Sequence, residues 1–346
     1  MKKYFGLQLH ITDLCDQKCC HCYIYANNKS EIMEGLEFDK IVLIINNFLE
    51  FCDKYGVLPH IFVTGGDPLL HKDIWAILEY LFKKNVKFSI LGNPFHLTNA
   101  TCIKLKELGC YQYQMSLDGL QVTHDSIRKS GSFNETIEKY NLLRINGIRT
   151  AAMTTVSKYN ISDIPKLIQI VVDNKIDCFA FARYCPKSKD EIQQIVSPRE
   201  YKKLLGDCWN VFRKNINSQT VFCLKDHLWI PFLDEIGQLK LIHNSENYIL
   251  DGCNCAIAHM TVLPNGDIYA CRRFESKVGN ALVDKFSDVY VGDSMEEYRH
   301  YDKFQACSSC KYLYYCRGCP AVMADISGDF YSPDPQCWIF KEKIDG

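Results

Sequence analysis

The apolar positions in the first half of the chain alternate between two periods. Short runs rich in β-branched and aromatic residues are each followed by a longer segment with apolar residues three or four positions apart. The predicted strands are residues 4–11, 60–64, 87–91, 111–117, 149–156 and 177–182. The predicted helices are residues 38–55, 73–85, 98–108, 132–146, 161–174 and 198–216. The pattern therefore predicts six strand–helix units in succession.

Start and stop signals for helices support these limits. Ser132 and Ser197 are each followed three residues later by glutamate, which predicts a capping box at both positions. Gly109 and Gly147 follow predicted helices and favour their termination. After about residue 218 the alternation stops, and residues 264–267 predict a hairpin turn. We therefore expect two domains, 1–218 and 219–346.

Successive strand–helix units favour a parallel sheet, because a strand that returns in parallel needs a helical crossover. Six units do not complete an eight-stranded barrel, so we expect a partial barrel or a doubly wound sheet. In both architectures active sites gather at the carboxyl ends of the strands. The segments that follow the first four predicted strands are Cys15–Tyr23, Gly65–Pro68, Gly92–Pro94 and Asp118–Gly119. These segments are therefore the candidate site.

The segment Cys15–Tyr23 has four cysteines in eight residues and contains the spacing C-x3-C-x2-C. Three cysteines and His21 are one possible zinc site, since structural zinc takes four protein ligands. The alternative is a [4Fe–4S] cluster, which takes four thiolates when fully ligated and here would keep one iron open. A third explanation is coincidence in a cysteine-rich chain.

Composition narrows the class of protein. The 346 residues are 47% hydrophobic and 23% charged, with a formal net charge of -1, so no strong attraction to nucleic acid or anionic membrane is expected. The first residues lack a signal-peptide pattern, and no later run is long and apolar enough for a membrane span. We expect a cytoplasmic protein, whose 19 cysteines then favour metal binding over disulfides.

The cysteines near the carboxyl end form a second group of eight. They divide into two potential four-ligand sites, and C-x2-C pairs suit zinc as well as iron–sulfur clusters. These cysteines are Cys253, Cys255, Cys271, Cys307, Cys310, Cys316, Cys319 and Cys337. Seven scattered cysteines are instead expected to be small buried hydrophobic residues: Cys52, Cys102, Cys110, Cys178, Cys185, Cys208 and Cys223.

Taken together, the motifs resemble the radical SAM enzymes that carry a SPASM domain. The resemblance extends from Leu7 to Cys337 and includes C-x3-C-x2-C before Tyr23 and Gly-Gly-Asp-Pro at 65–68. It also includes Ser116–Gly119 with Arg128, Asn265–Asp267 before Cys271, and the cysteines up to Cys337. It implies a partial (β/α)6 TIM-like barrel, followed by a small Cys-rich domain that binds auxiliary iron–sulfur clusters.

The resemblance also implies the cofactors. Cys15, Cys19 and Cys22 would hold a [4Fe–4S] cluster whose open iron binds S-adenosylmethionine (SAM), while Cys20 would remain unliganded. Cleavage of SAM would give a 5′-deoxyadenosyl radical that takes a hydrogen atom from the substrate. The glycines would let backbone approach the methionine part, and Asp67 or its carbonyl neighbours would accept from its ammonium group. The implied SAM-binding residues are Tyr23, Gly65, Gly66, Asp67, Asn93, Ser116, Asp118 and Arg128.

Two auxiliary [4Fe–4S] clusters are implied for the second domain. Cys253 or Cys255 would join Cys271 and Cys319 at one cluster. Cys307, Cys310, Cys316 and Cys337 would hold the other.

The resemblance further implies a peptide or protein substrate. Sulfatase-maturing members have a catalytic aspartate after the third auxiliary cysteine, but this chain has Arg272, and a guanidinium is not a base at neutral pH. We therefore expect a maturase that installs a crosslink in a ribosomal precursor peptide, with Arg183 as a candidate anchor for a carboxylate. The alternatives are a sugar or alcohol dehydrogenase or epimerase, a sulfatase-type maturase, and a non-catalytic zinc protein.

The partners expected of such a maturase follow from its chemistry. An electron donor such as flavodoxin or ferredoxin would reduce the cluster. Because the chain begins almost at the first strand, leader-peptide binding would fall to the barrel mouth or to a separate protein.

Overall fold

The computed structural model describes residues 3–25, 32–242 and 249–340. The chain forms two units, which are described separately. Unit 1 comprises residues 1–117, 125–152 and 255–299, and unit 2 comprises residues 118–124, 153–254 and 300–346. Both units combine segments from either side of residue 218, so the predicted domain boundary there stays a prediction.

Unit 1 is built around strands in the order β10-β9-β8-β1-β2-β3-β4. Strands β1 to β4 pair in parallel, β8 is parallel to β1, and β8, β9 and β10 pair antiparallel. Their bounds are β1 Tyr4–Thr12, β2 Leu58–Gly65, β3 Lys87–Leu91, β4 Gln112–Ser116, β8 His259–Val262, β9 Asp267–Tyr269 and β10 Lys277–Asn280. Strand β5 (Arg149–Val156) has residues in both units. The parallel pairing confirms the predicted α/β class.

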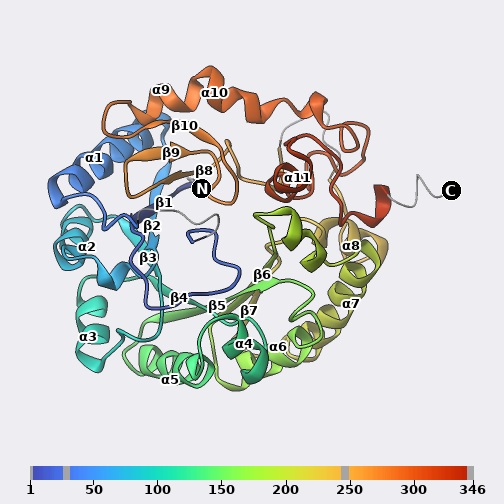
Figure 1. Ribbon diagram of the computed structural model, residues 1–346, viewed down its shortest axis with the longest axis horizontal. Coiled ribbons are helices and arrows are strands. Elements are labelled where there is room, and N and C mark those ends of the chain that lie inside the picture. Colours follow the sequence, from blue (N-terminus) through green and yellow to red (C-terminus); the bar gives the residue numbers. More distant parts are fainter. Residues whose placement is uncertain (1–2, 26–31, 243–248, 341–346) are drawn as a thin grey trace. The chain divides into compact units, whose positions relative to one another are not determined.

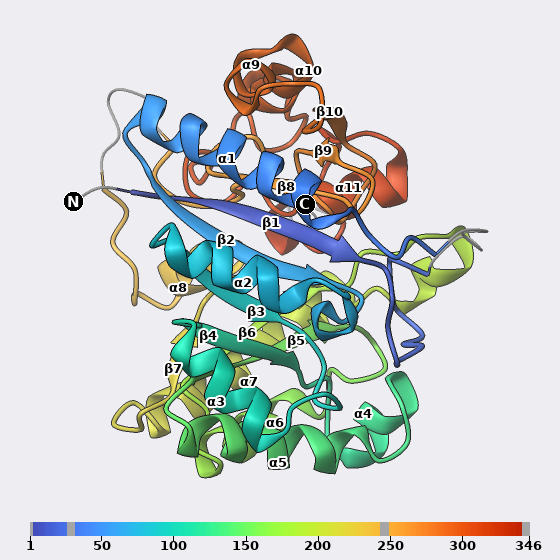
Figure 2. The same ribbon diagram turned by 90° about the vertical axis from the view of Figure 1, so that its left-hand side faces the viewer.

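Helices α1, α2 and α3 cover one face of β1–β4 (Figures 1 and 2). The apolar stripe predicted for α1, which consists of Ile41, Ile45, Phe48 and Cys52, is buried, and α1 packs against β1 and β2. The helices of this unit are α1 Phe38–Tyr55, α2 Ile74–Lys83, α3 Asn99–Glu107, α5 Ser132–Ile145, α9 Phe286–Val291 and α10 Asp293–Glu296, with short 3-10 turns η1 Pro68–Leu70 and η3 Glu297–Arg299. Helix α4 (Gln121–Ile127) has residues in both units.

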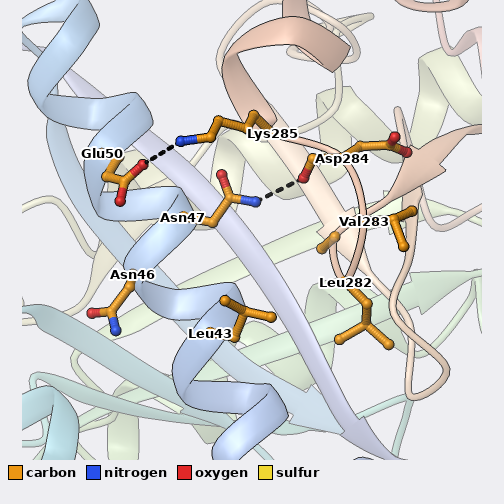
Figure 3. Close-up of a pocket in the computed structure, with 9 residues that line it drawn as sticks. Leu43, Asn46, Asn47, Glu50, Leu282, Val283, Asp284 and Lys285 are labelled. Carbon is orange, nitrogen blue, oxygen red and sulfur yellow. Dashed lines mark hydrogen bonds and ion pairs between the residues drawn. The ribbon is translucent and has the colours of Figure 1, made fainter.

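A loop after β10 is attached to α1 (Figure 3). Asn47 of α1 donates from Nδ2 to the Asp284 carbonyl at 2.8 Å and accepts at Oδ1 from the Phe286 amide at 3.1 Å. Lys285 pairs with Glu50 at 3.1 Å, and these residues line an open surface pocket of about 200 Å³. Residues almost 240 positions apart are thus joined within unit 1.

Unit 2 contains β6 and β7 in parallel and packs around aromatic side chains. Trp229 is buried among Phe181, Phe212 and Phe232, with ring centroids 5.7 Å apart in each pair. The elements are α6 Ile164–Asp173, β6 Cys178–Arg183, α7 Pro198–Lys214, β7 Val221–Cys223, α8 Trp229–Glu235 and α11 Pro320–Ser327, with 3-10 turns η2 Lys189–Gln194 and η4 Tyr301–Lys303.

Most local signals in the sequence match the structure. The capping box at Ser197 is present, with its side chain accepting from the Glu200 amide and Glu200 accepting from the Ser197 amide. The capping box predicted at Ser132 is wrong, because Gly131 is the residue that caps α5 and the Ser132 hydroxyl accepts from Gln17 instead. Within the described ranges, no helix is long and apolar enough to cross a membrane.

Candidate active site

The segments that follow β1, β2 and β3 meet at the carboxyl ends of these strands. Asn93, after β3, donates from Nδ2 to the Cys15 thiol at 3.2 Å and to Asp16 Oδ1 at 2.9 Å. His96 lies 3.3 Å from Asp16 Oδ2. Burial raises the pKa of the Cys15 thiol, whereas hydrogen bonds from Asn93 and the Gln17 backbone favour its thiolate. Asn93 therefore orients the first cysteine of the C-x3-C-x2-C motif.

The two glycines at the end of β2, Gly65 and Gly66, let two backbone segments touch. The Gly66 amide donates to the Thr12 carbonyl at 2.8 Å, and the Asp67 amide donates to the Leu14 carbonyl at 2.7 Å. A Cβ on Gly65 would lie 2.0 Å from the Thr12 oxygen, and one on Gly66 would lie 2.1 Å from the Leu14 oxygen. Gly65 also has φ +141°, which disfavours other residues. These glycines are therefore required by the approach to the cysteine segment itself; their contact with SAM stays a prediction.

Asp67 is fully buried beneath this junction. Its Oδ1 accepts from the Leu69 amide at 3.2 Å, while Oδ2 has no hydrogen-bond partner among the described residues. Burial raises the pKa of this carboxyl to about 7. An inaccessible carboxylate oxygen without a donor is costly, and a cationic ligand would remove that cost.

The rest of the cysteine segment is tied to the end of α4 and the start of α5. Gln17 donates from Nε2 to the Ser132 hydroxyl at 3.1 Å, and Arg128 donates from Nη1 to Gln17 Oε1 at 3.3 Å. Arg128 Nη1 also lies 3.6 Å from the Cys19 thiol. Arg128 thus contacts a proposed cluster ligand, which the sequence motif alone did not indicate.

Cys20 differs from its neighbours in exposure. Its side chain is exposed, whereas Cys15, Cys19 and Cys22 are partly buried. Its backbone amide donates to the Ile127 carbonyl at 2.9 Å, and the Cys22 amide donates to the Cys19 carbonyl at 3.1 Å. The prediction that Cys20 is not a ligand stays a prediction, and its exposure supports it.

Tyr23 lies between the cysteine segment and the segment that contains Cys271. The guanidinium of Arg272 stands over the Tyr23 ring, 4.6 Å from its centroid. Burial raises the pKa of Tyr23, the positive charges of Arg272 and Arg273 lower it, and Cys22 and Cys271 raise it. In the sequence, Arg272 shows only that the position after Cys271 lacks an aspartate. Nothing in the local sequence indicates its contact with the ring of Tyr23, 249 positions earlier.

The predicted residues after β4 have different surroundings. Ser116 is the last residue of β4 and is partly buried. Asp118 belongs to unit 2, where its Oδ1 accepts from the Thr155 amide at 2.8 Å and its carbonyl accepts from Asn160 Nδ2 at 2.8 Å. Asp118 is fully buried, so the structure gives it a role in holding the end of β5 and the chain that follows it. Its role in SAM binding stays a prediction.

Four of the carboxyl-terminal cysteines come together in unit 2. Burial, together with the neighbouring thiols of Cys310 and Cys337, raises the pKa of Cys307 to about 12. Cys316 is buried with Cys307 and Cys337 nearby, and its thiol accepts from the Gly318 amide at 3.3 Å. This is the set predicted for the second auxiliary cluster.

The other predicted auxiliary ligands are divided between the units. In unit 1, Cys255 and Cys271 both lie close enough to Tyr298 to raise its pKa, although burial is the larger cause. In unit 2, the Cys253 carbonyl accepts from Arg317 at 3.2 Å, and the Cys319 amide donates to Asp334 at 2.9 Å. Their ligand roles stay predictions.

Arg183 is fully buried in unit 2. Its Nε donates to Asp226 Oδ2 at 2.8 Å, and its Nη1 donates to both Asp334 oxygens at 2.8 and 2.9 Å. Asp334 in turn holds the Cys319 amide, so this buried network orients the cysteine-containing segment. The substrate-anchoring role predicted for Arg183 stays a prediction, and the structure gives the side chain a structural one.

The residues around Cys15 fit a cluster with bound SAM. Three cysteines occur in one segment, and the unpartnered buried oxygen of Asp67 lies at the adjoining strand end, which suits the ammonium group of a methionine moiety. Arg128 and Asn93, both within hydrogen-bond range of a cysteine thiol, would stabilise the negative charge of a thiolate-ligated cluster.

Comparison with known proteins agrees with this chemistry. Fe-coproporphyrin III synthase of Methanosarcina barkeri is 24% identical, covering 97% of this chain and 88% of that protein. The subtilosin biosynthesis protein AlbA of Bacillus subtilis is 22% identical, covering 99% of this chain and 73% of that protein. The solved structure of Streptococcus suis SuiB bound to SAM has a TM-score of 0.77 at 21% identity, covering 97% of this chain and 78% of SuiB. A further SuiB structure contains its precursor peptide SuiA.

Two family models match the chain, in the order that the motifs predict. The radical SAM superfamily model matches residues 9–171, and the SPASM iron–sulfur cluster-binding domain matches residues 253–320. These domains use SAM, a [4Fe–4S] cluster and auxiliary iron–sulfur clusters. The chain therefore carries a radical SAM domain and, in its carboxyl-terminal part, a SPASM domain.

Proposed function

We propose that this radical SAM enzyme abstracts a hydrogen atom from a ribosomal precursor peptide and installs a crosslink. The observation that carries the proposal is the shared fold with SuiB, one of whose structures contains a precursor peptide. AlbA, a bacteriocin biosynthesis protein, adds support from sequence. Arg272 argues against the sulfatase-type alternative, because a guanidinium is not a base at neutral pH.

The residues described above would prepare the reaction. Asn93 and Arg128 orient and stabilise the thiolates, and Asp67 receives the ammonium group of SAM. When bound, SAM and the clusters supply the radical that takes one hydrogen atom from the substrate and the acceptor for the remaining electron. Because the Asp67 carboxyl is fully buried, water would be excluded from its ion pair with the ammonium group, and this exclusion would strengthen the pair.

Mass spectrometry tests the proposal directly. The enzyme, reconstituted with iron and sulfide without oxygen, is incubated with reductant, SAM and the peptide encoded beside its gene. A crosslink lowers the peptide mass by two hydrogen atoms. A Cys15→Ala variant serves as the control without an intact cluster and should leave the mass unchanged. Unchanged peptide with the active wild-type enzyme would refute the proposal.

The relatives favour a second candidate function. Fe-coproporphyrin III synthase matches nearly the whole of both chains, which makes an iron tetrapyrrole the other substrate class to test. A change in the visible absorption of an added iron tetrapyrrole, dependent on SAM and reductant, would identify this activity.

We also propose the setting in which the enzyme works. A flavodoxin or ferredoxin would supply the electron, and a separate protein could bind the leader peptide. A cytoplasmic location suits this chemistry, because the peptide and the reductant are both found there. Co-purification with each candidate partner, and cell fractionation, would test these points.

A further inference from the structure

Arg272 has a buried guanidinium nitrogen without an acceptor among the described residues. This nitrogen is Nε, which is inaccessible to solvent. The contact that the structure gives its guanidinium is with the ring of Tyr23, at 4.6 Å. By contrast, Arg299 also stacks on a ring, that of Tyr290, but donates to two carbonyls and to Glu296.

An arginine with a buried N–H donor that lacks an acceptor is suited to bind an anion. Guanidinium groups carry five N–H donors in a planar fork that matches a carboxylate, and a buried donor without an acceptor destabilises the fold. The ring of Tyr23 holds the plane of the guanidinium through a cation–π contact. The guanidinium thus has a fixed orientation and still has an N–H donor without an acceptor.

Its position indicates what the anion belongs to. Tyr23 follows Cys22 directly in sequence, and Arg272 follows Cys271. The 4.6 Å contact between the Arg272 guanidinium and the Tyr23 ring brings the neighbours of these two cysteines together. The guanidinium therefore lies next to the cysteine segment that would hold the catalytic cluster, where a substrate must come close to react.

We propose that Arg272 binds a carboxylate of the substrate and so selects acidic substrates for this site. This inference rests on the proposed function for the type of substrate, but not for the carboxylate, which a peptide with acidic side chains and an iron coproporphyrin both carry. Arg272 is a binding residue in this proposal, and Tyr23 is the residue that positions it.

Binding measurements on the cluster-loaded enzyme test the inference. The first probe is the peptide encoded beside the gene, compared with a copy whose aspartates and glutamates are changed to amides. The second is iron coproporphyrin III, compared with its methyl ester. The wild type is expected to bind one acidic probe about tenfold to hundredfold more tightly than the neutral copy. Arg272→Gln should remove this preference, and Arg272→Lys should keep part of it.

Three controls separate this role from others. Arg299→Gln removes an equivalent stacked positive charge and should leave the preference intact. Iron content and SAM affinity of Arg272→Gln should equal those of the wild type, which shows that the variant is folded. An enzyme that does not act on peptides should bind neither the acidic peptide nor its neutral copy. It should still bind iron coproporphyrin III more tightly than the methyl ester. Failure of the proposed function can therefore be told apart from failure of this inference.

Three results would overturn the inference. The first is a wild type that binds neither acid form more tightly than its neutral copy. The second is an Arg272→Gln variant with an unchanged preference. The third is a loss of SAM affinity in Arg272→Gln, which would assign the guanidinium to the carboxylate of SAM instead.

Discussion

The carboxyl group of Asp67 is fully buried and has a raised pKa, and this pKa predicts how SAM binding depends on pH. The pKa of about 7 means that the carboxyl keeps its proton from about pH 4 up to neutrality. SAM affinity should therefore be highest above pH 7 and fall by up to about tenfold per unit below it, as the anionic form becomes scarce. Isothermal titration of the cluster-loaded enzyme with SAM between pH 6 and 8 measures this.

Asp67→Asn is the matched variant. The Asn side chain can still accept from the Leu69 amide, but it offers no charge to an ammonium group, so SAM affinity should fall about tenfold to hundredfold at pH 8. The variant should also lose the dependence on pH. Equal affinity of variant and wild type at pH 8 would show that Asp67 does not contact the ammonium group.

Cys20 and Cys19 provide a second comparison at the residue scale. Cys20→Ala should retain the full iron content, because the exposed Cys20 side chain is outside the predicted ligand set. Cys19→Ala should lose about four iron atoms per chain. Iron analysis and visible absorption after anaerobic reconstitution give the answer. Loss of iron in Cys20→Ala with retention in Cys19→Ala would reverse the assignment.

The sequence identified the cysteines and glycines of the site but not what holds them. Asn93 was an implied SAM-binding residue, and the structure shows that it donates to both Cys15 and Asp16. The contact of Arg272 with Tyr23 joins positions far apart in the chain. A motif fixes residue types at short spacing, whereas such contacts depend on how strands are arranged, and one sequence contains no record of that arrangement.

At the scale of elements, Asn47 of α1 is predicted to stabilise the loop after β10. Asn47→Ala removes a donor and an acceptor that hold the Asp284 carbonyl and the Phe286 amide, and should cost about 1–3 kcal/mol of unfolding free energy. Lys285→Ala is the control, because the Lys285–Glu50 pair is about two-thirds exposed and such pairs contribute about 0–1 kcal/mol. Urea unfolding followed by circular dichroism compares them; a larger effect of Lys285→Ala would contradict the ranking.

Elements with strong periodicity were predictable, and those made by distant pairing were not. Helix α1 and strands β3 and β5 have the predicted bounds, because their apolar spacing and flanking glycines are local signals. The pairing of β8 with β1 was not predicted, although the hairpin turn before β9 was. A short strand that joins a sheet edge some 250 residues away has no local signature beyond its apolar residues.

On the scale of the whole molecule, the sequence divides the cysteines into ligands and buried hydrophobic residues, and this division predicts the iron content. Three cubane clusters require about 12 iron atoms per chain. Cys316→Ala should reduce this to about 8, because Cys316 is buried beside Cys307 and Cys337, in the set predicted for one auxiliary cluster. SAM binding should persist, since Cys15, Cys19 and Cys22 remain in place.

Cys208 of α7 is the matched control for Cys316. Both thiols are buried in unit 2, and burial raises the pKa of each. Cys316 also has the thiols of Cys307 and Cys337 nearby, whereas the charged neighbour of Cys208 is Asp207 and not another cysteine. Cys208→Ala should therefore keep about 12 iron atoms and lose only some stability, as expected for a small buried hydrophobic residue. Equal iron loss in both variants would mean that burial, and not ligation, explains the effect. Stoichiometric zinc in place of iron would refute the cluster assignment for the whole chain.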